Sequence, residues 1–165
     1  MDKQIYKLPL YTLASGLIIR IIFYFVVLTA VSLTTEWSVW MSNSLLTARL
    51  AASAVLFIFI GRHLCRTYTR QTCFRAASYL FVYSVITLVL EQLMLRTGNY
   101  GQINDLLYLP VEIFNPITSV TLMLFGKSVP GWLCAVPSLF APYLFLFFST
   151  DGSDGAAPAA GHTDF

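Results

Sequence analysis

The sequence contains little charge. Only 11% of its 165 residues are Asp, Glu, Lys or Arg, whereas 57% are hydrophobic and the mean hydropathy is +0.71. Soluble domains carry roughly 25% charged residues, so this composition excludes an ordinary soluble domain. The formal net charge of +2 is too small to indicate nucleic-acid binding. The composition therefore predicts a protein whose surroundings are the lipid bilayer and which has no nucleic-acid partner.

Cysteine and histidine are also scarce. The three cysteines, Cys65, Cys73 and Cys134, imply no disulfide framework. His63 lies close to two of them, but the spacing matches no zinc-ligand pattern, so no metal and no cofactor are predicted. The apolar segments contain no Ser, His and Asp set and the chain has no HExxH motif. No catalytic residue is therefore predicted, and a membrane-embedded enzyme is the least favoured function.

What the chain does contain is a series of long apolar segments. They have roughly the 17 to 25 residues that a membrane-spanning helix needs. We therefore predict an all-α integral membrane protein in which residues 1–150 form a single compact bundle of five transmembrane helices. The predicted spans are residues 10–33, 44–61, 76–95, 106–125 and 129–148.

Two parts of the chain depart from this regular pattern. In the fourth segment Pro110 and Pro116 flank Glu112 and Asn115, so four spans plus a re-entrant segment is the alternative topology. Residues 151–165 are rich in Gly, Ala, Pro and Asp and are predicted to be a disordered polar tail.

The basic residues predict the orientation, because Lys and Arg near helix ends are retained on the cytoplasmic side. Most of them precede the first span, join the second to the third, or lie between the fourth and the fifth. Only Arg96 falls on the other side, together with Glu36, Asp105 and an acidic tail. This pattern predicts an N-terminus inside, a C-terminus outside, and a first span that is an uncleaved anchor. The residues assigned to the inner side are Lys3, Lys7, Arg62, Arg66, Arg70, Arg75 and Lys127.

Four charged residues lie within the apolar segments. Each costs about 2.5 to 3.5 kcal/mol near the centre of a membrane-spanning helix. Their charges sum to zero, which is expected if they pair across helices inside the bundle. They are Arg20 in the first segment, Arg49 in the second, Glu91 in the third and Glu112 in the fourth.

Polar residues at helical spacing accompany these charges. Tyr108, Glu112, Asn115 and Ser119 recur at i, i+4, i+7 and i+11 and would form one polar face of the fourth segment. The fifth segment has no such stripe. We therefore expect the first four helices to surround a polar interior in the outer half of the membrane, with the fifth helix packed outside it.

The segment from Pro110 to Pro116 is the strongest candidate for a site. Prolines free backbone carbonyl groups, and interrupted helices bind ions and polar ligands. A carboxylate and an amide one turn apart are suited to holding a cation, a proton or a polar ligand. The alternative is that the charges only hold the helices together. The candidate ligand-binding or ion-pairing residues are Glu112, Asn115, Arg49, Glu91, Arg20, Tyr108 and Ser119.

A second group of residues predicts a contact with lipid. Arg62, Arg66 and Arg70 recur at i, i+4 and i+8 and would form one basic face if the second helix extends into the cytoplasm. Anionic lipid headgroups are the expected partner of this face, and a role in orientation alone is the simpler alternative.

These features favour two non-enzymatic functions. The chain is short, lacks catalytic motifs and offers small-residue and basic docking surfaces, so an accessory or assembly subunit of a membrane complex is the leading hypothesis, with another membrane protein as partner. A small carrier or solute-binding component with an outward-facing site around Glu112 is the alternative. The expected location is a cell membrane, in which the chain is multi-pass, and the short loops favour a bacterial plasma membrane.

Overall fold

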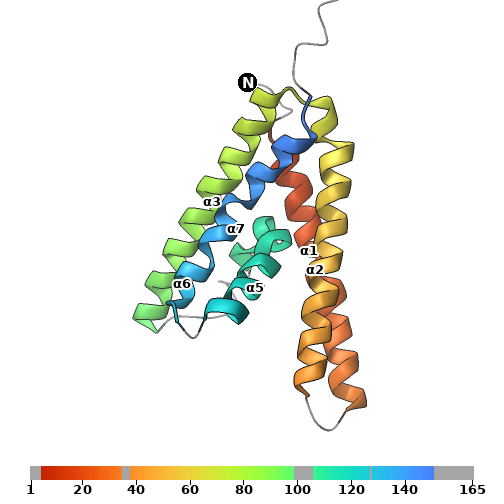
Figure 1. Ribbon diagram of the computed structural model, residues 1–165, viewed down its shortest axis with the longest axis vertical. Helices are drawn as coiled ribbons and strands as arrows, with labels where there is room; N and C mark the ends of the chain where they lie inside the picture. Colours follow the sequence, from red (N-terminus) through yellow and green to blue (C-terminus); the bar gives the residue numbers. More distant parts are fainter. Residues whose placement is uncertain (1–4, 35–37, 99–105, 127, 151–165) are drawn as a thin grey trace, which may run out of the picture.

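The computed structural model describes residues 5–34, 38–98, 106–126 and 128–150, and in these ranges the chain is mainly helical and has no β-strand (Figure 1). Four helical stretches are long and apolar enough to cross a membrane. The first three are α1 (Lys7–Leu33), α2 (Val39–His63, which runs on into a short 3-10 helix, Cys65–Thr67) and α3 (Arg70–Thr97). The predicted all-α fold of a membrane protein is confirmed at this level, but the predicted count of five spanning helices is not.

Local sequence explains where α2 and α3 begin and end. The side chain of Ser38 accepts a hydrogen bond from the amide of Met41 at 3.2 Å, and Thr69 does the same for Thr72 at 3.3 Å. These N-caps satisfy amide groups that a helix leaves unpaired in its first turn. At its other end α3 stops at Gly98, which adopts a left-handed conformation with φ of 71°. Glycine adopts this conformation without steric cost and ends helices for that reason.

The fourth predicted span is short and broken. It consists of a 3-10 helix, η2 (Leu109–Phe114), followed by α5 (Asn115–Phe125). A proline lies in the first turn of each piece, because proline has no amide to donate and is accepted only there. The 17 residues from Leu109 to Phe125 thus form a shorter, interrupted apolar helix that does not belong to the four long apolar stretches.

The last helical stretch runs antiparallel to α3. It consists of α6 (Gly131–Cys134), α7 (Val136–Phe140) and η3 (Ala141–Phe148), and prolines punctuate it at each junction. Phe81 packs on Phe140 with ring centroids 5.3 Å apart, and Phe74 packs on Tyr143 at 5.5 Å. Because this pairing is antiparallel, the end of α3 and the start of α6 lie at the same end of the molecule (Figure 1). The segment between them, which contains η2 and α5, leaves this end and returns to it.

At the opposite end of the molecule, hydrogen bonds and ring contacts join the elements, and we call it the closed end. The end at which α3 stops and α6 begins is called the open end. The amide of Thr150 donates a hydrogen bond of 3.3 Å to the carbonyl oxygen of Tyr68, and a parallel bridge joins Thr69 to Thr150. Tyr6, just before α1, stacks on Tyr79 of α3 with ring centroids 6.2 Å apart. The first and last described residues therefore lie at one end, with the connection between α2 and α3. The number of membrane crossings stays a prediction, and the tail at residues 151–165 lies outside the described residues. Below, η2 and α5 together are called the re-entrant segment.

Large apolar side chains cover the outside of the bundle, as expected for a surface in contact with lipid rather than water. Phe25, Ile58, Val82 and Leu93, from three different helices, are all about half exposed. The buried core is small and lies toward the closed end, where aromatic rings of α2, η2 and η3 meet. Toward the open end, the α1–α2 pair diverges from α3 and α6, and η2 and α5 lie between them (Figure 1).

The second helix does extend past its predicted span, but not as far as Arg70. Arg62 lies in the last turn of α2 and Arg66 in the 3-10 helix that follows it, and the chain then turns before Arg70, which begins α3. At this turn the side chains of Cys65 and Tyr68 are buried, and the 3-10 helix packs on η3. The three arginines are nevertheless all exposed at the closed end.

Candidate functional site

The helix η2 packs directly against α1 at Gly16, which has no side chain. A Cβ atom added to Gly16 would overlap the carbonyl oxygen of Leu109 and would lie 2.9 Å from the Cβ atom of Glu112. Only glycine permits such close approach of the two backbones. Gly16 thus fixes the depth at which the carboxyl group of Glu112 enters the bundle.

Glu112 forms an ion pair with Arg49 of α2. A guanidinium nitrogen of Arg49 donates a hydrogen bond to the Oε1 atom of Glu112. The side chain of Glu112 is 1% exposed and that of Arg49 is 31% exposed. The negative charge is therefore enclosed within the protein, whereas the positive charge reaches its surface. In a region of low dielectric, such a pair stabilises the carboxylate that would otherwise be costly to bury.

The second carboxyl oxygen of Glu112, Oε2, is buried and has no hydrogen-bond partner among the described residues. The same holds for the Nε atom of Arg49 and for the hydroxyl group of Ser53, one turn further along α2. Buried polar atoms are nearly always hydrogen-bonded, so such an atom calls for an explanation. Glu112 also lines the pocket described below, so this oxygen is the candidate acceptor for a hydrogen bond from a bound molecule.

A second carboxylate lies beside the first. The hydroxyl group of Tyr108 donates a hydrogen bond to the Oε2 atom of Glu91 on α3. Tyr83, two turns earlier on α3, donates a hydrogen bond of 2.7 Å to the carbonyl oxygen of Leu107. These two bonds fasten the start of the re-entrant segment to α3, so that both carboxylates are held by the same short stretch of chain.

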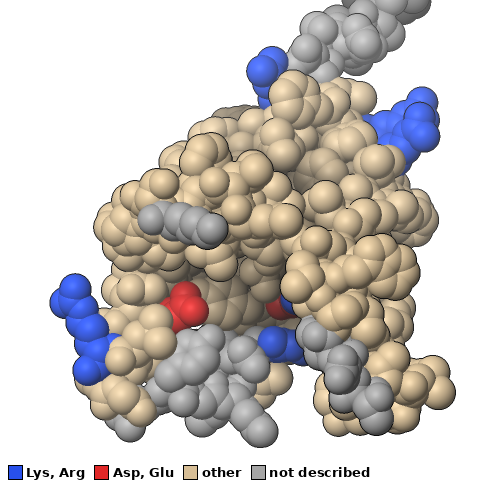
Figure 2. All heavy atoms as spheres, turned by 60° about the horizontal axis from the view of Figure 1, so that its bottom comes forward, with Lys and Arg blue, Asp and Glu red and all other residues tan. Residues whose placement is uncertain are grey.

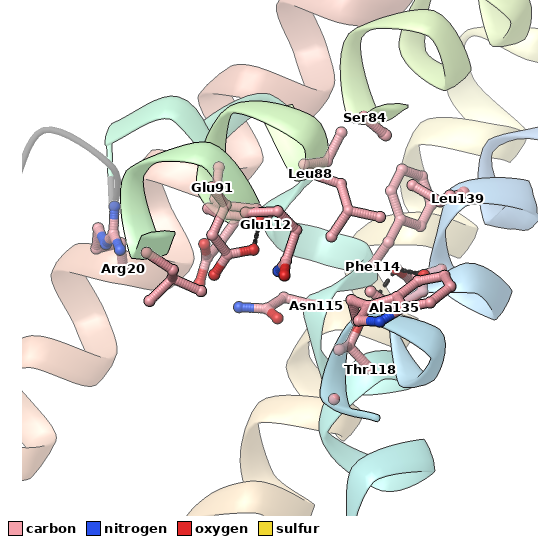
Figure 3. A pocket seen from close by; sticks show the side chains of 17 residues that line it. Arg20, Ser84, Leu88, Glu91, Glu112, Phe114, Asn115, Thr118, Ala135 and Leu139 are labelled. Carbon is pink, nitrogen blue, oxygen red and sulfur yellow. Dashed lines mark hydrogen bonds between the residues drawn. The ribbon is translucent and has the colours of Figure 1, made fainter. Parts of the chain in front are cut away.

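The two carboxylates line one pocket of about 530 Å³ (Figure 3). Arg20, Glu91, Glu112 and Asn115 gather at one side of it, and Leu88, Phe114 and Leu139 form the other side. Figure 2 shows acidic and basic side chains inside a hollow of the face at the open end, with further cationic side chains around the opposite end. The pocket is formed by α1, α3, the re-entrant segment, α6 and α7. Its other lining residues are Ser84, Gln92, Leu95, Tyr108, Val111, Thr118, Gly131, Trp132, Ala135 and Ser138.

Five of the seven sequence-predicted site residues line this pocket: Arg20, Glu91, Tyr108, Glu112 and Asn115. The remaining two are placed differently. Arg49 does not line the pocket, but it pairs with Glu112, which does. Ser119 does not line it either; its hydroxyl group bonds to the carbonyl oxygen of Asn115 at 3.4 Å, within its own helix.

The predicted arrangement of helices around the polar interior is wrong in one respect. The prediction places the last helical stretch outside, but its Trp132 and Ser138 line the pocket, whereas no residue of α2 does. Ser138 accepts a hydrogen bond of 2.9 Å from Thr118 of α5. The prolines near Ser138 break the helix and bring it against the re-entrant segment. The detectable signal is Ser138 itself, a small polar residue beside Pro137 in an otherwise apolar stretch.

The lining of the pocket is suited to binding a small molecule. Among the described residues, no three His, Cys, Asp or Glu side chains come close enough to hold a metal ion. The lining offers a guanidinium group, two carboxylates, two amides and an indole, opposite an apolar wall. Such a combination can orient a small molecule that has both charged and apolar parts.

No protein-family model, curated protein or solved structure matches this chain. Its function is therefore inferred from its own residues and geometry.

Proposed function

We propose that this protein binds a small polar solute in the pocket around Glu112, as a carrier or solute-binding component of a membrane. The observation that carries the proposal is the fully buried carboxyl group of Glu112, which lines a pocket of about 530 Å³ with one oxygen atom lacking a partner among the described residues. Ionisable residues in membrane-spanning segments are costly and mark ligand or ion pathways. A broken helix at the site supports the same interpretation, because unwound segments form the binding sites of many transporters.

We further propose a topology of four spans and one re-entrant segment, with the N-terminus and the C-terminus both in the cytoplasm, in place of the outside C-terminus of the five-span prediction. Among the described residues, five basic ones, Lys7, Arg62, Arg66, Arg70 and Arg75, lie at or near the closed end, against Arg96 at the open end. This asymmetry favours the cytoplasm as the side of the closed end. The pocket then opens toward the outside of the cell membrane, a bacterial plasma membrane in this proposal.

Cysteine labelling tests this topology. In a variant without the native cysteines, a cysteine is introduced at Thr67, Ser128 or Ser153 and intact cells are treated with a membrane-impermeant maleimide. We expect labelling at position 128 only, because the other two positions lie in the cytoplasm. Labelling at position 153 from outside, with position 128 protected, would establish five spans instead.

The solute-binding proposal is tested by thermal unfolding of the purified protein in detergent. The probes are representative amino acids, amines, carboxylates and sugars, each at millimolar concentration. We expect at least one class to raise the melting temperature of the wild type and of Ser119→Ala, but not of Glu112→Gln. Ser119 is the matched control, since it is polar, belongs to the same segment and does not line the pocket. If no probe stabilises the wild type, the proposal is refuted.

An accessory-subunit role is the second candidate, and one observation favours it. The open-end halves of α1 and α2 carry exposed apolar side chains, among them Phe25, Leu33, Val39 and Trp40, which are 59 to 80% exposed. A partner helix or lipid chains would cover them. Purification in mild detergent should then yield a stoichiometric membrane partner that is lost on replacement of Phe25 and Trp40 by Ala. A solitary monomer would exclude this role.

The three arginines at the closed end are proposed to contact anionic lipid. Arg62, Arg66 and Arg70 are exposed, and in this topology they lie at the level of the cytoplasmic lipid headgroups. Native mass spectrometry of the protein extracted from phosphatidylglycerol-containing membranes should show retained lipid that the triple Gln variant lacks. Equal retention would leave orientation as the only role of these residues.

A further inference from the structure

We infer that the ligand of the pocket is a zwitterion that carries a primary ammonium group near an anionic group and an apolar extension. This inference rests on the proposed function and names the class of solute. It follows from three features of the pocket: its charge balance, the positions of its charged groups and its apolar wall.

The charge balance excludes a ligand with a large net charge. Among the described residues, Arg20, Arg49, Glu91 and Glu112 are the four charges that line the pocket or pair with a residue that does, and they sum to zero. A net cation or anion in the pocket would leave an uncompensated charge inside the membrane, which is costly in a medium of low dielectric. A zwitterion adds no net charge and still uses charged partners of both signs.

The ammonium half of the ligand fits Glu112. Its buried Oε2 atom accepts no hydrogen bond from the described residues, while Arg49 holds the other oxygen. The carboxylate of Glu91 lies on the same side of the pocket (Figure 3). A primary ammonium has three N–H donors and can donate hydrogen bonds to both carboxylates at once. A quaternary ammonium has none and would leave the Oε2 atom without a partner.

The anionic half fits Arg20. Gly16 of α1 lies against Glu112, and Arg20 follows it by four residues on the same face of the helix. The Arg20 backbone is thus about 6 Å further toward the open end, and helical side chains lean back toward the N-terminus. The five donors of a guanidinium can hold an anion in addition to the interaction that Arg20 makes with the protein. The two charged groups are therefore spaced for a compact zwitterion.

The apolar extension fits the opposite wall. Leu88, Phe114 and Leu139 line the pocket there (Figure 3), and the Trp132 ring adds a further apolar surface. A volume of about 530 Å³ exceeds that of an ammonium and a carboxylate alone. Two sources supply this chemistry, a free apolar amino acid and the headgroup of a lipid such as phosphatidylethanolamine.

The experiment measures binding to the purified wild type in detergent by calorimetry with five probes. L-phenylalanine and dihexanoyl-phosphatidylethanolamine carry the full pattern. Phenylethylamine lacks the anion, phenylpropionate lacks the ammonium, and dihexanoyl-phosphatidylcholine lacks the N–H donors. We expect one of the first two to bind roughly 10- to 100-fold more tightly than its incomplete analogues, because each analogue loses a charge-assisted contact. Which of the two binds more tightly identifies the source.

Variants test the assignment of each group. Arg20→Gln should weaken binding of the zwitterion by roughly 10-fold or more and change phenylethylamine binding little. Glu112→Gln should weaken the binding of both ligands. The matched control is Arg96→Gln, which removes an exposed arginine of α3 near the same end that does not line the pocket. Its affinity for all probes should equal that of the wild type.

The outcomes separate this inference from the proposed function. If phenylethylamine or phenylpropionate binds as tightly as L-phenylalanine, and phosphatidylcholine also binds as tightly as phosphatidylethanolamine, the zwitterion inference is overturned while a solute site remains. If none of these probes binds but a sugar or another solute does so in a manner sensitive to Glu112→Gln, the inference is likewise overturned. If no solute of any class binds, the proposed function fails as well.

Discussion

The ion pair between Arg49 and Glu112 predicts an unequal cost for removing its two partners. Arg49→Met leaves a carboxyl group that is 1% exposed without its cation, whereas Glu112→Leu leaves a guanidinium that is 31% exposed. The guanidinium can extend along its aliphatic stem toward the surface, and the carboxyl group cannot move in the same way. The loss of stability on replacing Arg49 should therefore be the larger one.

The magnitude follows from what the buried carboxyl group can do. Breaking a buried pair costs about 3 to 5 kcal/mol, but the isolated carboxyl group can take up a proton instead. A glutamic acid with the ordinary pKa of about 4.3 costs about 3.7 kcal/mol to keep protonated at pH 7. We therefore expect Arg49→Met to lose about 3 to 4 kcal/mol at pH 7 and Glu112→Leu about 1 to 2 kcal/mol. The double variant should lie within about 1 kcal/mol of the wild type, since neither unpaired charge remains.

The sign of the pH dependence distinguishes this reasoning from a simple packing defect. In Arg49→Met, folding takes up a proton at Glu112, so the variant should become more stable as the pH falls. The expected gain is about 1.4 kcal/mol per pH unit between pH 7 and pH 5. Unfolding in mixed dodecylmaltoside and sodium dodecyl sulfate micelles at three pH values measures all four proteins of the cycle.

Two results would refute this account. One is a cost for Arg49→Met that is equal to or smaller than that for Glu112→Leu. The other is additivity in the double variant, which would mean that the two side chains are not coupled in the folded protein.

Two further predictions concern the attachment of the re-entrant segment. Gly16→Ala should destabilise the protein by about 1 to 3 kcal/mol in the same assay, because the added Cβ atom overlaps the backbone of η2. Gly131→Ala meets nothing within 4 Å and should be neutral, and a neutral Gly16→Ala would show that the helices can separate freely. Tyr83→Phe should cost about 1 kcal/mol through loss of its bond to the carbonyl oxygen of Leu107. Tyr24→Phe, at a 64% exposed residue, should cost nothing, and equal effects at both tyrosines would contradict the role of that bond.

The sequence by itself determined that the long segments of this protein are suited to a lipid bilayer, and where its prolines and charged residues lie along the chain. Long apolar segments are a local property of the chain, so α1, α2 and α3 could be predicted near their actual positions. The prolines of the fourth segment likewise indicate a departure from a regular helix, because their effect on the backbone is local. Helical spacing grouped Tyr108, Glu112 and Asn115 on one face, because periodicity is read within a single helix.

Only the tertiary structure decided which faces meet. η2 lies directly on α1 because Gly16 has no side chain. Nothing in the sequence around Gly16 distinguishes it from a glycine that serves ordinary helix packing. That Ser138 lines the pocket and Ser119 does not depends on how α5 is placed between two other elements. The pairing of Arg49 with Glu112, 63 positions apart, and the return of the re-entrant segment to the end it left arise from contacts between distant parts of the chain. Such contacts leave no periodic trace in the sequence, because each depends on the shapes of two surfaces at once.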